Sequence, residues 1–197
     1  MFYKLIIASA TCATLTACIA PTPALAPEIT FMTELNTLCG KAFEGKVVST
    51  DEVDNDFASQ RVVMHVRDCS DHEVRIPLHV GENRSRTWVL TRDRDGLELR
   101  HDHRHEDGEP DAVTQYGGFV RTETSTEIRS EFPADAQTKS IFDANNISVS
   151  NQNVWAVEVR PKDDLFAYEL RRPNRFFRLE FDLSAPVETP PAAWGFE

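Results

Sequence analysis

Hydrophobic and polar residues alternate along most of this chain, which is the pattern of strands that bury one face. The stretch 177–183 shows it most clearly, because Phe177, Leu179 and Phe181 fall on one side and charged residues fall on the other. The same period-two pattern predicts strands at 61–69, 73–80, 84–92, 97–105, 119–132, 154–160 and 165–171.

Turn and helix signals divide these stretches. Asp95-Gly96 is a strong two-residue turn signal, and Gly117-Gly118 predicts a second turn. Apolar residues recur at helical spacing in 28–38, between a proline and a glycine, and 134–144 has the same character. We therefore predict a mainly β fold: a single antiparallel barrel or sandwich of about eight or nine strands, with a short N-terminal helix and one inserted helix.

The first residues have the pattern of a targeting segment. Lys4 precedes an apolar run over residues 5–17. The run is shorter than the roughly 20 residues that span a bilayer, but it has the length of a secretory signal. Because a proline follows both Ala20 and Ala26, ordinary cleavage after either residue is disfavoured.

Leu15-Thr16-Ala17-Cys18 closely resembles the lipobox of bacterial lipoprotein precursors. The resemblance covers residues 1–18 only. It implies that the Cys18 sulfur carries a diacylglyceryl group, that cleavage falls before Cys18, and that the new α-amine is acylated. Ile19, where inner-membrane lipoproteins usually have Asp, implies the outer membrane of a Gram-negative cell. The alternative is a plain secreted or soluble periplasmic protein.

This interpretation sets the domain boundaries. Residues 1–17 are the signal peptide, and residues 18–27 are a proline-rich tether. Residues 28–184 form the β-rich domain, and residues 185–197 form a proline-rich tail.

Processing of the N-terminus leaves two cysteines for the domain. Cys12 is lost with the signal peptide and Cys18 takes the lipid, so Cys39 and Cys69 remain in an oxidising compartment. We predict a disulfide between them. The competing interpretation is a redox or metal-binding pair, although the chain has no C-x-x-C motif.

Charge limits the kinds of partner. The 197 residues carry a net charge of −11, with 41% hydrophobic and 27% charged residues. Such a chain has enough apolar material for one core, and its acidity argues against nucleic-acid binding. The expected contacts are the membrane, through the lipid on Cys18, and an envelope protein or a small apolar ligand.

Histidines give the one chemical signal in the domain. On the strand predicted at 97–105, His101, His103 and His105 share the face of Leu97 and Leu99. Imidazole is a common ligand of zinc and copper, and two neighbouring histidines on one face can chelate an ion, whereas three would span about 13 Å. The alternatives are structural histidines that cap the core and a metal-free catalytic or pH-sensing role.

Familiar catalytic motifs such as G-x-S-x-G and H-E-x-x-H are missing. The leading hypothesis is thus a lipid-anchored, periplasm-facing lipoprotein that binds a partner or small molecule without catalysis and needs no cofactor. One alternative is a metal-binding protein or metalloenzyme that uses the three histidines. Another is a carrier for an apolar ligand, with a cavity lined by Trp88, Trp155 and Phe177.

Overall fold

Eleven strands form one antiparallel sheet in the computed structural model, which describes residues 25–196. Ten strands follow in the order β7-β6-β5-β4-β2-β1-β11-β10-β9-β8, and β3 pairs with β4. The strands are β1 (Ala42–Val47), β2 (Val62–His65), β3 (Asp68–Cys69), β4 (Glu73–Val80), β5 (Asn83–Asp93), β6 (Gly96–His103), β7 (Tyr116–Phe119), β8 (Arg129–Pro133), β9 (Val154–Arg160), β10 (Leu165–Arg172) and β11 (Arg175–Val187).

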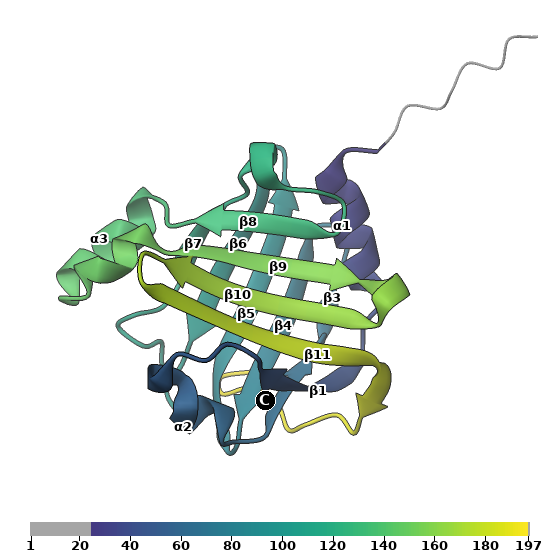
Figure 1. Cartoon of the computed structure of the whole chain (residues 1–197), viewed down its shortest axis with the longest axis horizontal. Helices are drawn as coiled ribbons and strands as arrows, with labels where there is room; N and C mark the ends of the chain where they lie inside the picture. The colour runs from purple at the N-terminus through teal and green to yellow at the C-terminus, as the bar shows by residue number, and fades with distance from the viewer. Residues whose placement is uncertain (1–24, 197) are drawn as a thin grey trace, which may run out of the picture.

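The sheet curls into a nearly closed barrel. The first strand, β1, pairs with the last, β11, so the open seam lies between β7 and β8. Two backbone hydrogen bonds cross this seam: the Arg121 amide donates to Glu131 over 2.7 Å, and the Asp135 amide donates to Gly117 over 3.2 Å. Figure 1 shows two walls whose strands cross, with β8–β11 in front of β4–β6. The predicted fold class is confirmed, with more strands than expected.

Three differences account for the larger number of strands. The pattern analysis missed β1, the stretch 61–69 divides into β2 and β3, and the stretch 119–132 gives way to β7, a short helical turn and β8. The predicted turn at Gly117-Gly118 is wrong, because both glycines lie inside β7. They permit close backbone approach: a Cβ would lie 1.8 Å from the Leu99 oxygen at Gly117, and 2.0 Å from the Pro133 oxygen at Gly118.

Both predicted helices are present. They are α1 (Pro27–Asn36) and α3 (Ala136–Ala144), where the Asp135 side chain caps the first turn of α3 by accepting from the Thr138 amide. Shorter elements add α2 (Asn55–Ala58), η1 (Glu52–Asp54), η2 (Thr122–Thr124), η3 (Ser148–Gln152) and η4 (Pro161–Asp163).

The helix α1 seals one side of the barrel. Phe31, Met32 and Leu35 are almost wholly buried, and α1 contacts β4, β8 and β9. The predicted disulfide between Cys39 and Cys69 is confirmed, with 6.1 Å between the two Cα atoms, and it ties the chain just after α1 to β3.

The C-terminal segment begins as strand. β11 continues to Val187, three residues into the segment predicted as a tail. Beyond it, Ala193 is buried, and the Phe196 ring lies 4.9 Å from the Arg104 guanidinium. The tail thus packs against the barrel.

No helix within residues 25–196 is long and apolar enough to cross a membrane. The predicted signal peptide, Cys18 and most of the tether lie outside the described residues.

Candidate functional site

A cavity of about 110 Å³ lies inside the barrel, on the side away from α1. Its wall combines apolar and polar side chains from α2 and from both walls of the barrel, and α1 and α2 lie at opposite sides of the molecule (Figure 1). We call this cavity the pocket; it is lined by Phe57, Leu78, Arg86, Trp88, His101, His103, Tyr116, Tyr168, Leu170 and Phe177.

Strand alternation places the polar groups of the pocket. In β6, His101 and His103 point inward because they continue the face of the buried residues Leu97 and Leu99. The register then sets their neighbours. His101 lies opposite Trp88 of β5 and Tyr116 of β7, and His103 lies opposite Arg86 of β5.

Two hydrogen bonds fix the orientation of the His101 ring. Its Nδ1 lies 3.0 Å from the Tyr116 carbonyl oxygen, which can only accept, so Nδ1 carries the proton. Its Nε2 therefore accepts from the Tyr168 hydroxyl, 2.7 Å away. The Trp88 ring stacks on Tyr168 with 4.4 Å between centroids. Both nitrogens of His101 are thus occupied by protein groups.

His103 is only half satisfied. Its Nε2 lies 3.2 Å from the Tyr116 hydroxyl. Its Nδ1 has no hydrogen-bond partner among residues 25–196, and the ring lines the pocket. One nitrogen of a ring that lines the pocket therefore has no hydrogen-bond partner within the described chain.

Burial keeps these groups uncharged at neutral pH. It lowers the pKa of His101 to about 3 and that of His103 to about 4, with the Arg86 charge adding to the effect on His103. Burial also raises the pKa values of Tyr116 and Tyr168 above their ordinary value. The pocket consequently holds neutral imidazoles and protonated phenols.

Arg86 supplies the positive charge at the pocket. Its Nη1 donates to the side-chain oxygens of Asn83 (3.0 Å) and Ser85 (3.3 Å), and its guanidinium lies 5.9 Å from the centroid of the Phe57 ring. Within residues 25–196 it forms no salt bridge. Its remaining N–H groups are therefore not neutralised by a carboxylate of the described chain.

Most apolar side chains of the described residues belong to one continuous buried core. The pocket that Trp88 and Phe177 line is much smaller than the apolar cavity that the carrier hypothesis expects. Trp88 and Phe177 line the pocket as that hypothesis expects, but Trp155 does not; it packs 5.1 Å from the His101 ring instead. A volume of about 110 Å³ is below the roughly 300 Å³ at which pockets for drug-sized ligands begin.

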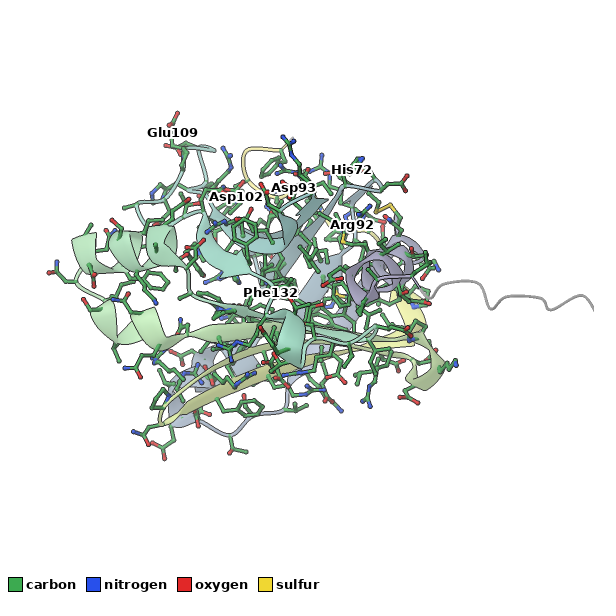
Figure 2. The ribbon with its side chains drawn as sticks, turned by 90° about the horizontal axis from the view of Figure 1, so that it is seen from above. His72, Arg92, Asp93, Asp102, Glu109 and Phe132 are labelled. Carbon is green, nitrogen blue, oxygen red and sulfur yellow. A yellow bond between two sulfur atoms is a disulfide. The ribbon has the colours of Figure 1, made fainter. Side chains whose placement is uncertain are left out.

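The three histidines of the metal hypothesis do not converge. β6 ends at His103, and His105 lies in the exposed loop beyond it, with its Nε2 3.7 Å from an Asp111 oxygen. Figure 2 shows Glu109 at the outer tip of this loop, pointing away from the barrel. Among residues 25–196, no group of three or more His, Cys, Asp or Glu side chains is placed to hold a metal ion.

A larger groove of about 820 Å³ runs over the outside of the barrel, beneath the C-terminal tail. Its arginines have protein partners: Arg61 pairs with Glu44 at 2.7 Å, and Arg84 donates to the Ala192 carbonyl at 2.9 Å. Three glutamates also line it. The groove therefore has its charges more evenly balanced than the pocket.

Sequence reasoning found His101 and His103 but not Arg86, Tyr116 or Tyr168. The sequence does contain a signal for Arg86, because it lies two residues from Trp88 in a correctly predicted strand and therefore shares its face. Tyr116 precedes two glycines whose sequence pattern predicts a turn and not a strand, so alternation did not reveal its inward position.

Comparison of this chain with protein-family models, with curated proteins and with solved structures finds no match to any of the three.

Proposed function

We propose that this chain is an envelope lipoprotein that binds a small molecule, without transforming it, in the pocket. The carrying observation is a cavity in an otherwise filled core, where Arg86 and His103 offer hydrogen-bonding groups that the described chain does not satisfy.

The free donors of the pocket are reached by water in the unliganded chain. No nitrogen of Arg86 or His103 belongs to the described buried polar atoms that lack a partner. Both residues line the pocket beside apolar side chains. A ligand that accepts hydrogen bonds could replace this water and bury its own apolar part, which supports a binding role.

Size restricts the ligand. A cavity of about 150 Å³ takes a molecule as large as benzene. The pocket, at about 110 Å³, suits a molecule of no more than about six non-hydrogen atoms.

The proposed location rests on residues 15–18. Acylation at Cys18 would attach the chain to the outer membrane, because more than one acyl chain gives stable anchoring. The domain would then face the periplasm. The described chain enters the domain through α1, on the side of the barrel away from the pocket. In a Cys18→Ser variant, the protein should move from the membrane fraction to the soluble fraction; retention in the membrane would contradict the anchor.

The binding test is a thermal-shift screen of the full, processed chain. The panel contains alcohols, amides, amines, carboxylates and small aromatics of up to about six non-hydrogen atoms. We expect at least one class to raise the melting temperature in a saturable manner. Leu170→Phe, which narrows the pocket, should abolish the shift, whereas the matched change at an exposed leucine, Leu25→Phe, should keep it. No shift with any class, or a shift indifferent to Leu170→Phe, would contradict the proposal.

A metal site remains the second candidate, since His101 and His103 both face the pocket and one His103 nitrogen is unoccupied. Native mass spectrometry distinguishes the two proposals. A mass excess of one zinc or copper ion, lost on chelation and in His103→Ala, would favour the metal site over the small molecule.

A further inference from the structure

We infer that the pocket takes a small monocarboxylate: an anionic head held by Arg86 and His103, with a short hydrocarbon body. This inference rests on the proposed function and names the chemical class of its ligand.

The charge of the site selects an anion. Arg86 carries a guanidinium cation, and among residues 25–196 no carboxylate pairs with it. The histidines beside it are neutral, and Asp102 and Asp111, whose carboxylates act on His103 at longer range, form no salt bridge with it. A cationic ligand would be repelled, and a neutral one would leave the guanidinium without a counter-charge in a partly desolvated site.

Hydrogen-bond geometry provides a second donor. If the Tyr116 hydroxyl donates to His103 Nε2, the His103 proton resides on Nδ1, the nitrogen that lacks a partner. Arg86 and His103 are register partners on β5 and β6 and both line the pocket, so a donor on Nδ1 would lie beside the guanidinium. Two converging donors suit the two oxygens of a carboxylate, and hydrogen bonds to charged acceptors are among the strong ones.

The remaining wall selects the body of the ligand. Leu78, Leu170, Phe177 and the rings of Phe57 and Trp88 form the apolar part of the lining. A fully hydrated inorganic anion gains nothing from such a surface, whereas a few methylene groups each gain about 0.8 kcal/mol on burial. The lining therefore favours a short organic acid over phosphate.

The test uses calorimetric titration of the full, processed chain in a buffer free of carboxylates. The probes are propionate, its neutral isostere propionamide, and inorganic phosphate. We expect propionate to bind at least tenfold more tightly than either of the others. Benzoate, with nine non-hydrogen atoms, should bind more weakly than propionate because it exceeds the volume of the pocket.

Two matched variants locate the binding. Arg86→Gln should weaken propionate binding at least tenfold and leave propionamide unchanged. Arg94→Gln makes the same change of charge in the exposed turn between β5 and β6, and it should alter propionate binding less than twofold. The comparison of propionate with propionamide on the unaltered chain stands even if Arg86→Gln does not fold.

The outcomes separate this inference from the proposed function. If propionamide binds as tightly as propionate and Leu170→Phe abolishes both, the pocket binds small molecules but the anionic class is wrong. If phosphate binds as tightly as propionate, the site selects ligands by charge alone and the carboxylate class is overturned. If propionate does not bind while the thermal-shift screen finds another class, only the inference is contradicted. If no small molecule binds in either experiment, both are contradicted.

Discussion

Arginines on the outer face of the front wall and the arginine at the pocket have different partners. Across β8–β11, Arg129, Arg171 and Arg178 interleave with glutamates, each within hydrogen-bonding distance of at least one carboxylate. Glu169, which is 7% exposed, binds both Arg129 and Arg178. We call this network the ladder. Arg86, by contrast, contacts only neutral side chains among the described residues.

This difference distinguishes arginines whose charge is neutralised within the fold from an arginine whose charge is available to a ligand. In the ladder, burial opposes ionisation of Glu169, but hydrogen bonds from Arg129 and Arg178 outweigh it and lower the pKa of its carboxyl group. The ladder is thus satisfied within the chain. In the pocket, Arg86 and His103 offer hydrogen-bond donors for which the described chain supplies no carboxylate acceptor, so a ligand can supply that acceptor.

Acid should destabilise the pocket side first. The pKa of His101 is about 3 and that of His103 is about 4, against 6.5 in an unfolded chain. The groups around His101 that modulate its charge are Arg100, His103 and the Tyr116 carbonyl. Between pH 6.5 and 4 the unfolded chain binds more protons than the folded one, so stability is full above pH 6.5 and falls as the pH drops.

We expect the free energy of unfolding to fall on the order of 5 kcal/mol from pH 7 to pH 4.5. Denaturant titrations at the two pH values measure it. His101→Gln should flatten this dependence, and His72→Gln, at an exposed histidine, should not. The ladder carboxylates have lowered pKa values, so their contribution is lost only below about pH 4.5. A stability that is constant between pH 7 and pH 4.5 would contradict the buried neutral histidines.

Removing a ladder carboxylate should have the next largest effect. Glu169→Ala removes the nearest carboxylate of Arg129 and of Arg178, while other glutamates stay within 3.6 Å of each, so we expect a loss of about 2–3 kcal/mol in the free energy of unfolding. Asp163→Ala is the control, since Asp163 is 60% exposed and pairs with Arg160 at 3.5 Å; its loss should be below about 1 kcal/mol. Equal costs for both variants would mean that burial of the ladder adds nothing.

The His101–Tyr168 hydrogen bond should have a moderate effect. Tyr168→Phe leaves the buried Nε2 of His101 without a donor, and we expect the free energy of unfolding to fall by about 1–2 kcal/mol. Tyr116→Phe removes a longer hydrogen bond at a half-buried site and should cost less stability, but it should weaken propionate binding more. Denaturant titration measures the stability of both variants, and calorimetry measures their affinity for propionate. If Tyr168→Phe weakened propionate binding more than Tyr116→Phe, the ligand would lie beside His101 instead of His103.

Arg86 itself should matter least for folding. Because it forms no ion pair within residues 25–196, Arg86→Gln should change the free energy of unfolding by less than about 1 kcal/mol. Denaturant titration measures this change. A loss as large as that of Glu169→Ala would show that Arg86 is part of the structural framework.

The sequence predicted the fold class because alternation is a local signal. It found the central strands, the helices α1 and α3, and the pairing of Cys39 with Cys69. It missed β1, where Glu44-Gly45-Lys46 interrupts the apolar positions; there Gly45 admits the Phe181 ring, which lies 2.5 Å from where a Cβ would be. Such close approach depends on a strand more than 130 residues away, which a local pattern does not contain.

The site was predicted in part for the same reason. Residues two apart on a strand share a face, so the pattern of β6 alone placed His101 and His103 inward. His105 is separated from them because β6 ends at His103. The meeting of those histidines with Tyr116 and Tyr168 depends on the register between strands and on closure of the barrel across the interior. Neither can be read from one strand alone.

The most direct test of the central claim is the nitrogen NMR spectrum of the full, processed chain with ¹⁵N-labelled histidine, recorded during a propionate titration. Protonated and bare nitrogens of a neutral imidazole give different shifts, so His103 reports its own tautomer. The account predicts that the His103 Nδ1 signal becomes that of a protonated nitrogen and moves in a saturable manner, while the His101 signals keep their pattern. A His103 ring that does not respond, with changes confined to exposed histidines, would contradict it.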